Sequence, residues 1–209
     1  MSTKKKYHSE IRQAQAAATR RRILAAARRL FSSRGFEKTT VDEVAVGAEV
    51  STPTIYMHFK SKEGVLRELV NEVLFGPDYR SLVDKSASSK DPREALRIAA
   101  HISRTIHDAE KSEIGLVRGA SALSPELRDL ELEGERLRYE RQRLVVARLE
   151  KARLLPRGMG IVQARDILWS LTSREVYRML VIERGWSSDE YQKWLAQTLL
   201  QILVGTAEE

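Results

Sequence analysis

Thr52, Pro53 and Thr54 lie together where the sequence predicts the start of a short helix. Ser51 can cap that helix through its hydroxyl, and proline suits a first helical turn because the amide hydrogen that it lacks has no partner there. A threonine hydroxyl can hydrogen-bond to a base edge, and a threonine methyl or a proline ring can rest against a thymine methyl. We therefore expect Thr52, Pro53 and Thr54 to contact DNA bases; the plainer alternative is that they only start a helix.

A second group of side chains has the chemistry of phosphate contacts. Tyr56 and His58 end the same predicted helix, where a phenol and an imidazole can donate to phosphate oxygens, although His58 could equally pack inside the protein. Lys60 and Lys62 flank the start of the following helix, and a helix amino terminus with nearby lysines attracts phosphate. Thr40 is expected to cap a helix first and to donate to phosphate second.

Two short helices joined by a tight turn must position these groups. Thr40 and Glu43 have the spacing of a capping box, so a helix is predicted from Val41. Apolar residues then recur at three- and four-residue spacing as far as Ala48, and the turn follows before Ser51. This pair has the proportions of a helix-turn-helix, whose second helix enters the major groove of DNA.

The positive charge of the chain is concentrated around this pair of helices. The formal net charge is +7; residues 1–65 hold 13 Lys or Arg against 6 Asp or Glu, and residues 66–209 hold 23 of each. A basic region at one end favours a polyanionic partner. An acidic membrane surface would require bulky apolar residues in the basic tail, which has only Tyr7 and Ile11, so we expect DNA and no membrane partner.

Catalytic and metal-binding patterns are missing from the sequence. There is no Cys, and His101 and His107 are six residues apart, so a helix would point them in different directions. The segment 119–123 lacks the second glycine of a nucleophile elbow, and the segment 158–160 lacks the third glycine of a dinucleotide-binding loop. We therefore expect no enzymatic activity, no cofactor and no metal.

Two further expectations concern ligands and location. Trp169, Tyr177, His101 and Arg118 could line a ligand cavity, but aromatic residues at helical spacing more often form a core, so no ligand-binding residue is assigned. The amino end is polar, and no apolar run approaches the roughly 18 residues of a membrane span. We expect a soluble, cytoplasmic protein.

Helical periodicity runs through most of the chain, and no alternating strand pattern of useful length appears, so the predicted fold class is all-α. Residues 1–11 are predicted to be disordered, residues 79–90 form a predicted polar linker, and residues 112–123 have a shorter helical signal. The longer predicted helices cover residues 12–34, 62–75, 92–110, 125–155, 161–185 and 188 onwards.

The last two predicted helices carry more apolar surface than a solvent-facing helix needs. Ser187 and Glu190 form a second capping box, after which apolar residues give the final helix a broad apolar face. A second copy of the chain could cover that face. A two-fold dimer would also present two reading heads to a palindrome.

Many spaced residues agree, in order, with the pattern of one protein family. They are Arg22-Ile23-Leu24, Ala27, Leu30-Phe31, Gly35-Phe36, Thr40-Val41, Val44-Ala45, Val50-Ser51 and residues 54–63. Through these residues the segment from 17 to about 77 resembles the TetR family of bacterial transcriptional regulators. A looser match to the family's regulatory half covers residues 183–187, Tyr191 and Trp194-Leu195.

Together with the basic tail at residues 1–16, the resemblance implies a three-helix DNA-binding head over residues 17–77, with the helix-turn-helix at about 40–59. A helical bundle for ligand binding and dimerisation follows over residues 78–209. The resemblance implies a homodimer through the last two helices, a palindromic operator in double-stranded DNA, and release of the repressor by a small-molecule effector. A DNA-binding or architectural protein with no effector is the alternative.

Two residues depart from the family pattern. Glu49 stands where the family usually places a glycine in the turn, so a left-handed backbone there would carry modest strain. Pro53 stands where many members have glycine, which predicts a stiffer helix start and leaves the base preference open.

Overall fold

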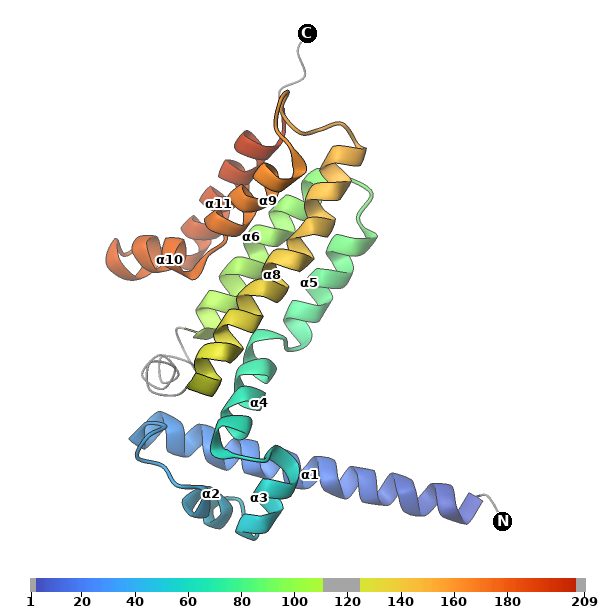
Figure 1. The fold of residues 1–209 in the computed structure, drawn as a ribbon, viewed down its shortest axis with the longest axis vertical. Helices are drawn as coiled ribbons and strands as arrows, with labels where there is room; N and C mark the ends of the chain where they lie inside the picture. Colours follow the sequence, from blue (N-terminus) through green and yellow to red (C-terminus); the bar gives the residue numbers. More distant parts are fainter. Residues whose placement is uncertain (1–2, 111–124, 206–209) are drawn as a thin grey trace. The chain divides into compact units, whose positions relative to one another are not determined.

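A computed structural model describes residues 3–110 and 125–205, and Figure 1 shows the order of the elements along the chain. Within these ranges the chain is helical and has no strand, which confirms the predicted all-α class. The helices are α1 Thr3–Arg34, α2 Val41–Gly47, α3 Thr52–Phe59, α4 Lys62–Leu74, α5 Pro77–Ser88, α6 Pro92–Ala109, α8 Pro125–Lys151, α9 Ile161–Leu171, α10 Arg174–Tyr177 and α11 Ser188–Leu203, with a π-helical segment, Arg178–Glu183, between α10 and α11.

The described helices belong to two compact units. Residues 3–72 lie in the first unit and include α1, α2, α3 and most of α4. Residues 73–110 and 131–205 lie in the second unit, which contains α5, α6, most of α8 and all the later helices.

The first unit has a small core to which all four of its helices contribute. Phe31 at the end of α1 packs edge-to-face against Phe36, with ring centroids 5.2 Å apart. Gly35 ends α1 with a left-handed backbone (φ 84°), as the sequence predicts, and its amide donates to the Phe31 carbonyl. The other buried apolar residues of this core are Ile23, Leu24, Ala26, Ala27, Val44, Ala45, Ala48, Ile55, Phe59, Val65, Leu66 and Leu69.

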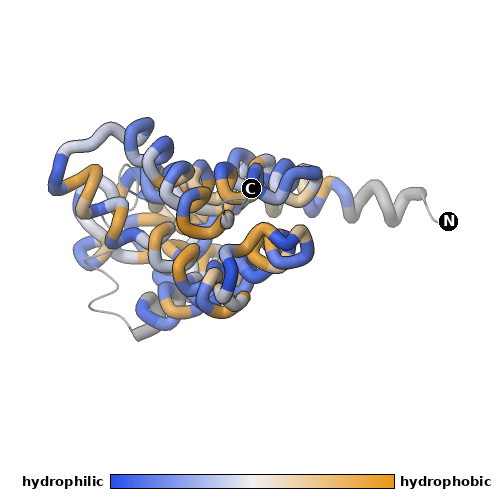
Figure 2. The backbone as a smooth tube through the Cα atoms, turned by 90° about the horizontal axis from the view of Figure 1, so that it is seen from above, coloured by the Kyte–Doolittle hydropathy of each residue, from blue (hydrophilic) through white to orange (hydrophobic). Residues whose placement is uncertain are grey.

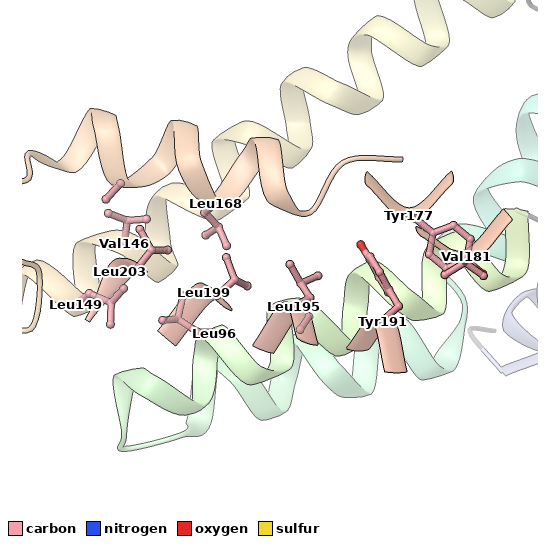
Figure 3. Close-up of a cluster of buried hydrophobic side chains, with 12 residues drawn as sticks. Leu96, Val146, Leu149, Leu168, Tyr177, Val181, Tyr191, Leu195, Leu199 and Leu203 are labelled. Carbon is pink, nitrogen blue, oxygen red and sulfur yellow. The ribbon is translucent and has the colours of Figure 1, made fainter. Parts of the chain in front are cut away.

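The second unit is held together by a cluster of buried apolar side chains, shown in Figure 3. Helices α6 and α11 pack along each other in this unit (Figure 1). Leu195, Leu199 and Leu203 of α11 are buried at four-residue spacing, which gives that helix one continuous apolar face. They meet residues of the same cluster from α6, α8 and α9, namely Leu96, Ala100, Val146, Leu149, Ala164 and Leu168.

The sequence predicts a polar linker over residues 79–90, and this prediction is wrong, because α5 occupies Pro77–Ser88. Pro77 lies in the first turn of α5, and contacts with distant residues hold the helix in place. Tyr79 packs edge-to-face on Phe75, and Arg141 of α8 donates a 2.8 Å hydrogen bond to the Tyr79 hydroxyl. These contacts compensate for a serine-rich sequence of low intrinsic helix propensity.

The prediction of a single helix over residues 161–185 is also wrong, because the helix is interrupted at Thr172 and Ser173. The Thr172 hydroxyl donates to the Leu168 carbonyl at 2.7 Å, and Ser173 caps a new helix by accepting a hydrogen bond from the Val176 amide. Hydroxyl groups of this kind compete with helical hydrogen bonding and favour helix ends. The chain then continues through α10 and the π-helical segment to Gly185, whose φ is 77°.

Other helix bounds differ less from the prediction. Helix α1 already begins at Thr3, although residues 1–11 are predicted to be disordered and the helix to begin at Arg12. Helix α8 ends at Lys151, four residues before the predicted end, and Arg153 follows with a positive φ of 55°. The predicted helix at 112–123 and the residue Arg118 lie outside the described residues.

Hydrophilic and hydrophobic positions alternate along the helices in Figure 2. This pattern belongs to helices with one apolar face. Over residues 3–110 and 125–205, no helix combines the length and the apolar character that crossing a bilayer would require.

Candidate nucleic-acid interface

The capping box predicted at the start of α2 is present. The Thr40 amide donates to Glu43 Oε2 at 2.8 Å, and the Glu43 amide donates to Thr40 Oγ1 at 3.2 Å. The hydrogen bond from the Thr40 backbone lowers the pKa of Glu43, and Arg34 pairs with the same carboxylate at 2.9 Å. The Thr40 hydroxyl also lies 3.2 Å from Glu43 Oε2, so its cap role is present in the fold before any contact with DNA.

Glu49, in the turn between α2 and α3 where the family usually has glycine, has a left-handed backbone with φ 54°. The turn is closed by a hydrogen bond from the Val50 amide to the Ala45 carbonyl at 3.0 Å. A non-glycine residue with this backbone carries a modest strain energy. The Glu49 carboxylate lies 3.9 Å from Arg22 in an exposed ion pair.

Ser51 occupies the predicted cap position of α3, but its predicted cap hydrogen bond is absent. Its backbone is extended, and its hydroxyl pairs with the Thr54 hydroxyl at 2.8 Å instead of with a helix amide. Pro53 lies in the first turn, as predicted. The Thr52 hydroxyl donates to Asp42 of α2 at 2.6 Å, a contact that the sequence patterns do not reveal. Both threonines at the start of α3 are therefore fixed by neighbouring side chains.

Helix α3 has one buried face and one exposed face. Ile55 and Phe59 are buried in the core of the first unit. Pro53 is exposed, and the exposed fractions of Tyr56 and Met57 are 49% and 74%. Met57 is absent from the sequence-based set of contacts, because a methionine in a helix is normally expected to pack in a core. Its spacing of four residues from Pro53 is the signal that could have placed it on this exposed face.

The end of α3 is held by Arg20 of α1. The Arg20 guanidinium lies over the Phe59 ring at 4.7 Å from its centroid, and it forms an ion pair with Glu68 of α4 at 2.7 Å. It also donates a long hydrogen bond of 3.5 Å to the His58 carbonyl. His58 itself is half-buried, so only part of its ring is accessible to a ligand.

Lys60 follows α3 directly, is exposed, and has an unusual backbone with φ 68° and ψ −34°. Its amide donates to the Tyr56 carbonyl at 2.9 Å and so completes the last turn of α3. The ammonium group of Lys60 is available for a phosphate contact at the end of α3.

Lys62 has a structural role that the sequence patterns do not reveal. Its ammonium group donates to the carbonyl oxygens of Phe36 and Thr39, both at 3.1 Å, and lies 4.2 Å from the centroid of the Phe36 ring. Since an ammonium group has three donors, two are used inside the protein and one remains. Thr39 is buried, and its hydroxyl donates to the Gly35 carbonyl at 2.9 Å. Lys62 thus fixes the segment that leads into α2.

In the second unit, a cluster of buried polar side chains lies between α8 and the end of α9. The Thr172 hydroxyl donates to Leu168 and therefore accepts from Arg138 and from the Gln142 amide nitrogen, each at 2.8 Å. This arrangement turns Gln142 Oε1 away from Thr172. Within the described parts of the chain, Gln142 Oε1 and Trp169 Nε1 are buried and have no hydrogen-bond partner. One acceptor and one donor are therefore left unsatisfied, although buried polar groups are normally paired.

A second cluster of polar side chains lies at the end of α6. His107 lies 3.0 Å from Glu110 Oε2 through Nδ1 and 3.3 Å from the Thr172 carbonyl through Nε2. Arg174 of α10 contacts both oxygens of Glu110, at 2.5 and 3.0 Å, and lies 3.5 Å from Glu131. Burial alone would raise the pKa of Glu110, but the hydrogen bonds from His107 and Arg174 lower it to about 2. Over residues 3–110 and 125–205, no group of His, Asp and Glu could hold a metal ion.

The segment that contains α2 and α3 is similar to a known protein family. Residues 23–69 match the family model described as bacterial regulatory proteins, tetR family. This match contains α2, α3 and Lys62, whereas Arg20 lies just before it. In this segment the chain is similar to the TetR family.

Two relatives match part of the chain. The HTH-type transcriptional regulator EthR of Mycolicibacterium smegmatis is 40% identical over 77 residues, which is 36% of this chain and 35% of that protein. The HTH-type transcriptional repressor KstR2 of Mycobacterium tuberculosis is 33% identical over 94 residues, or 42% of this chain and 45% of the relative. The chain thus spans less than half the length of these relatives.

A solved structure extends the likeness in fold to most of the chain. A transcriptional regulator from Saccharomonospora viridis, crystallised in complex with choline, has a TM-score of 0.67 and is 24% identical. The match covers 90% of this chain and 98% of that one. At this identity the likeness concerns the fold alone, and it includes the second unit.

Proposed function

We propose that this chain is a homodimeric transcriptional repressor that binds a palindromic operator in double-stranded DNA and leaves it when a small molecule binds. The observation that carries the proposal is the capped pair of α2 and α3, with the exposed face of α3, inside the segment that matches the TetR family. The excess of positive charge in residues 1–65 supports a polyanionic partner. A repressor of this kind would act in the cytoplasm.

The proposed domains are a basic tail at 1–16, a DNA-binding domain at 17–77 and a ligand-binding and dimerisation domain at 78–209. The proposed contacts divide into base readers and phosphate anchors. The base readers are Thr52, Pro53 and Thr54, at the amino end of α3. The phosphate anchors are Thr40, Tyr56, His58, Lys60 and Lys62.

Selection of binding sites from a library of random DNA duplexes tests operator binding. We expect the purified chain to enrich a palindromic sequence, and the affinity for that sequence to fall steeply as salt is added. Lys60→Glu should weaken binding to all duplexes. Lys90→Glu makes the same charge change at an exposed position of the second unit and should bind as the wild type does. Failure to enrich any sequence would overturn the proposal.

Exposed apolar side chains near the end of the chain support dimerisation. Val162 of α9, Met179 and Ile182 of the π-helical segment, and Ile202 of α11 have exposed fractions of 64%, 45%, 50% and 38%. Large apolar side chains that stay exposed can form part of a protein interface. Their place in the last helices fits a two-fold dimer that presents two copies of α3 to a palindrome.

The unsatisfied donor and acceptor at Trp169 and Gln142 support a small-molecule effector in the second unit. We expect a compound that raises the melting temperature of the chain also to release it from its selected duplex. Trp169→Phe keeps an aromatic ring but removes the donor, so it should reduce the thermal shift produced by that compound. A compound that binds without changing DNA affinity would favour a DNA-binding protein with no effector.

A further inference from the structure

Helix α3 lacks the side chains that usually distinguish purines in the major groove. Arg and Lys read guanine, and Asn and Gln read adenine, through paired hydrogen bonds to two atoms of one base. None of these four residue types occurs in Thr52–Phe59. If α3 reads sequence, it must do so mainly by other contacts.

The hydroxyl groups at the start of α3 are also partly used inside the protein. The hydrogen of the Thr52 hydroxyl is directed to Asp42, so Thr52 can accept but cannot donate while this 2.6 Å contact is kept. Ser51 and Thr54 share one hydrogen bond of 2.8 Å, which uses one of their two hydroxyl hydrogens. One free hydroxyl hydrogen therefore remains among these three residues.

The exposed face of α3 offers apolar groups instead. Pro53 is exposed, and Met57, four residues later, has an exposed fraction of 74%. Residues at this spacing lie on the same side of a helix, about 6 Å apart along its axis. A proline ring and a flexible thioether chain both suit contact with a small apolar group.

We propose that Pro53 and Met57 read the C5-methyl groups of thymines in the major groove. This methyl group is the apolar feature that distinguishes a thymine there from the other three bases. Bases in one strand are about 3.4 Å apart along the helix axis, so the two side chains would reach methyl groups about two base steps apart. The inference rests on the proposed DNA binding and adds the chemical group that sets sequence preference.

Replacement of thymine by uracil in the selected duplex tests this inference. Deoxyuridine pairs as thymidine does and keeps the same hydrogen-bonding groups, but it lacks the methyl. Single dT→dU changes across each half-site should reveal at least one position where affinity falls about fourfold, as expected for one methyl-sized apolar group. If every dU duplex binds as tightly as its dT parent, the inference is overturned.

Variants of the protein assign the methyl contacts to side chains. Met57→Ala should remove the uracil effect at one thymine, and Pro53→Ala should remove it at another. Val46→Ala shortens another exposed apolar side chain, 80% exposed on α2, and should keep the full uracil effect. If the uracil effect persists in both α3 variants, the methyl groups are read elsewhere and the inference fails.

The two proposals fail in different ways. If no duplex is enriched, the proposed operator binding fails. If a duplex is enriched and competes specifically, but is insensitive to uracil, operator binding stands and the methyl readout is overturned. Circular dichroism of Met57→Ala and Pro53→Ala should match the wild type, because both side chains are exposed.

Discussion

The ammonium group of Lys62, at the start of α4, donates a 3.1 Å hydrogen bond to the carbonyl of Thr39, 23 residues earlier in the chain. Since Thr39 directly precedes the cap residue of α2, this bond fixes the point from which α2 and then α3 extend. A residue proposed to contact phosphate thus also has a structural role in the unit that contains α2 and α3.

Lys62→Met should therefore reduce stability as well as DNA binding. The variant keeps the aliphatic chain but leaves two carbonyl groups without their donor, so we expect the free energy of unfolding to fall by about 1–3 kcal/mol. Lys60→Met, at an exposed position, should change it by less than about 0.5 kcal/mol. Chemical denaturation followed by circular dichroism checks both values.

The salt dependence of DNA binding separates the two roles of Lys62. If its third donor reaches a phosphate, Lys62→Met should lower the slope of log affinity against log salt by about one unit, as Lys60→Met should. An unchanged slope in Lys62→Met, measured by fluorescence anisotropy on the selected duplex, would remove Lys62 from the phosphate contacts and leave only its structural role.

Gly64 is predicted to be intolerant of a side chain. A Cβ atom at this position would lie 1.9 Å from the Phe59 carbonyl oxygen, so Gly64→Ala must displace the end of α3. We expect a loss of about 1–3 kcal/mol in unfolding free energy, as for other overpacked sites. Gly134→Ala in α8 has open space and should be neutral or stabilising by up to about 1 kcal/mol. Equal melting temperatures for the two variants would contradict the clash.

Glu110 should make the stability of the second unit depend on acid pH. Its pKa in the folded state is lowered from 4.5 to about 2, so the ionised form stabilises the fold above about pH 4.5, and this contribution is lost as the pH falls towards 2. The full contribution would be roughly 3 kcal/mol. Glu110→Gln should therefore be less stable than the wild type at pH 7, with the difference shrinking below pH 4.

Tryptophan fluorescence can follow this effect in the second unit alone, because all three tryptophans, Trp169, Trp186 and Trp194, lie there. Glu133→Gln, at an exposed position of α8, is the matched control and should keep the pH dependence of the wild type. A pH profile for Glu110→Gln parallel to that of the wild type would contradict the assignment.

Ile182→Arg should weaken the proposed dimer. The residue is 50% exposed on the π-helical segment, and a two-fold interface would contain the new charge twice. We expect the dimer dissociation constant to rise tenfold or more, measured by analytical ultracentrifugation over a range of concentrations. Val83→Arg, at a 37% exposed position of α5, should leave the dimer intact. A monomeric wild-type chain would refute the dimer itself.

Local signals explain which parts of the fold could be predicted from the sequence. The capping box of Thr40 and Glu43 and the terminating Gly35 act within a few residues, so α2 and the end of α1 appear where expected. Helix α5 could not be predicted in this way, because the bond from Arg141 to Tyr79 joins residues 62 positions apart. Local patterns carry no information about such contacts.

In the candidate site, too, the features set by neighbouring residues were predictable and those set by distant contacts were not. The turn at Glu49 and the place of Pro53 follow from neighbouring residues and were predictable. The bonds from Thr52 to Asp42 and from Lys62 to Thr39 depend on how separate helices meet, and the sequence analysis misses them. Met57 is missed for another reason, since its residue type is more common in cores than on a reading surface.

The backbone strain at Lys60 lowers the stability of the fold, whereas its charge is proposed to raise the affinity for DNA. A glycine would adopt its positive φ of 68° more easily, so Lys60→Gly would relieve strain at the end of α3 while removing a positive charge proposed to face DNA. Selection for a sturdier fold alone would favour glycine at this position. A lysine at this position would therefore mean that the chain tolerates backbone strain at the end of α3 because the lysine increases the affinity for the operator.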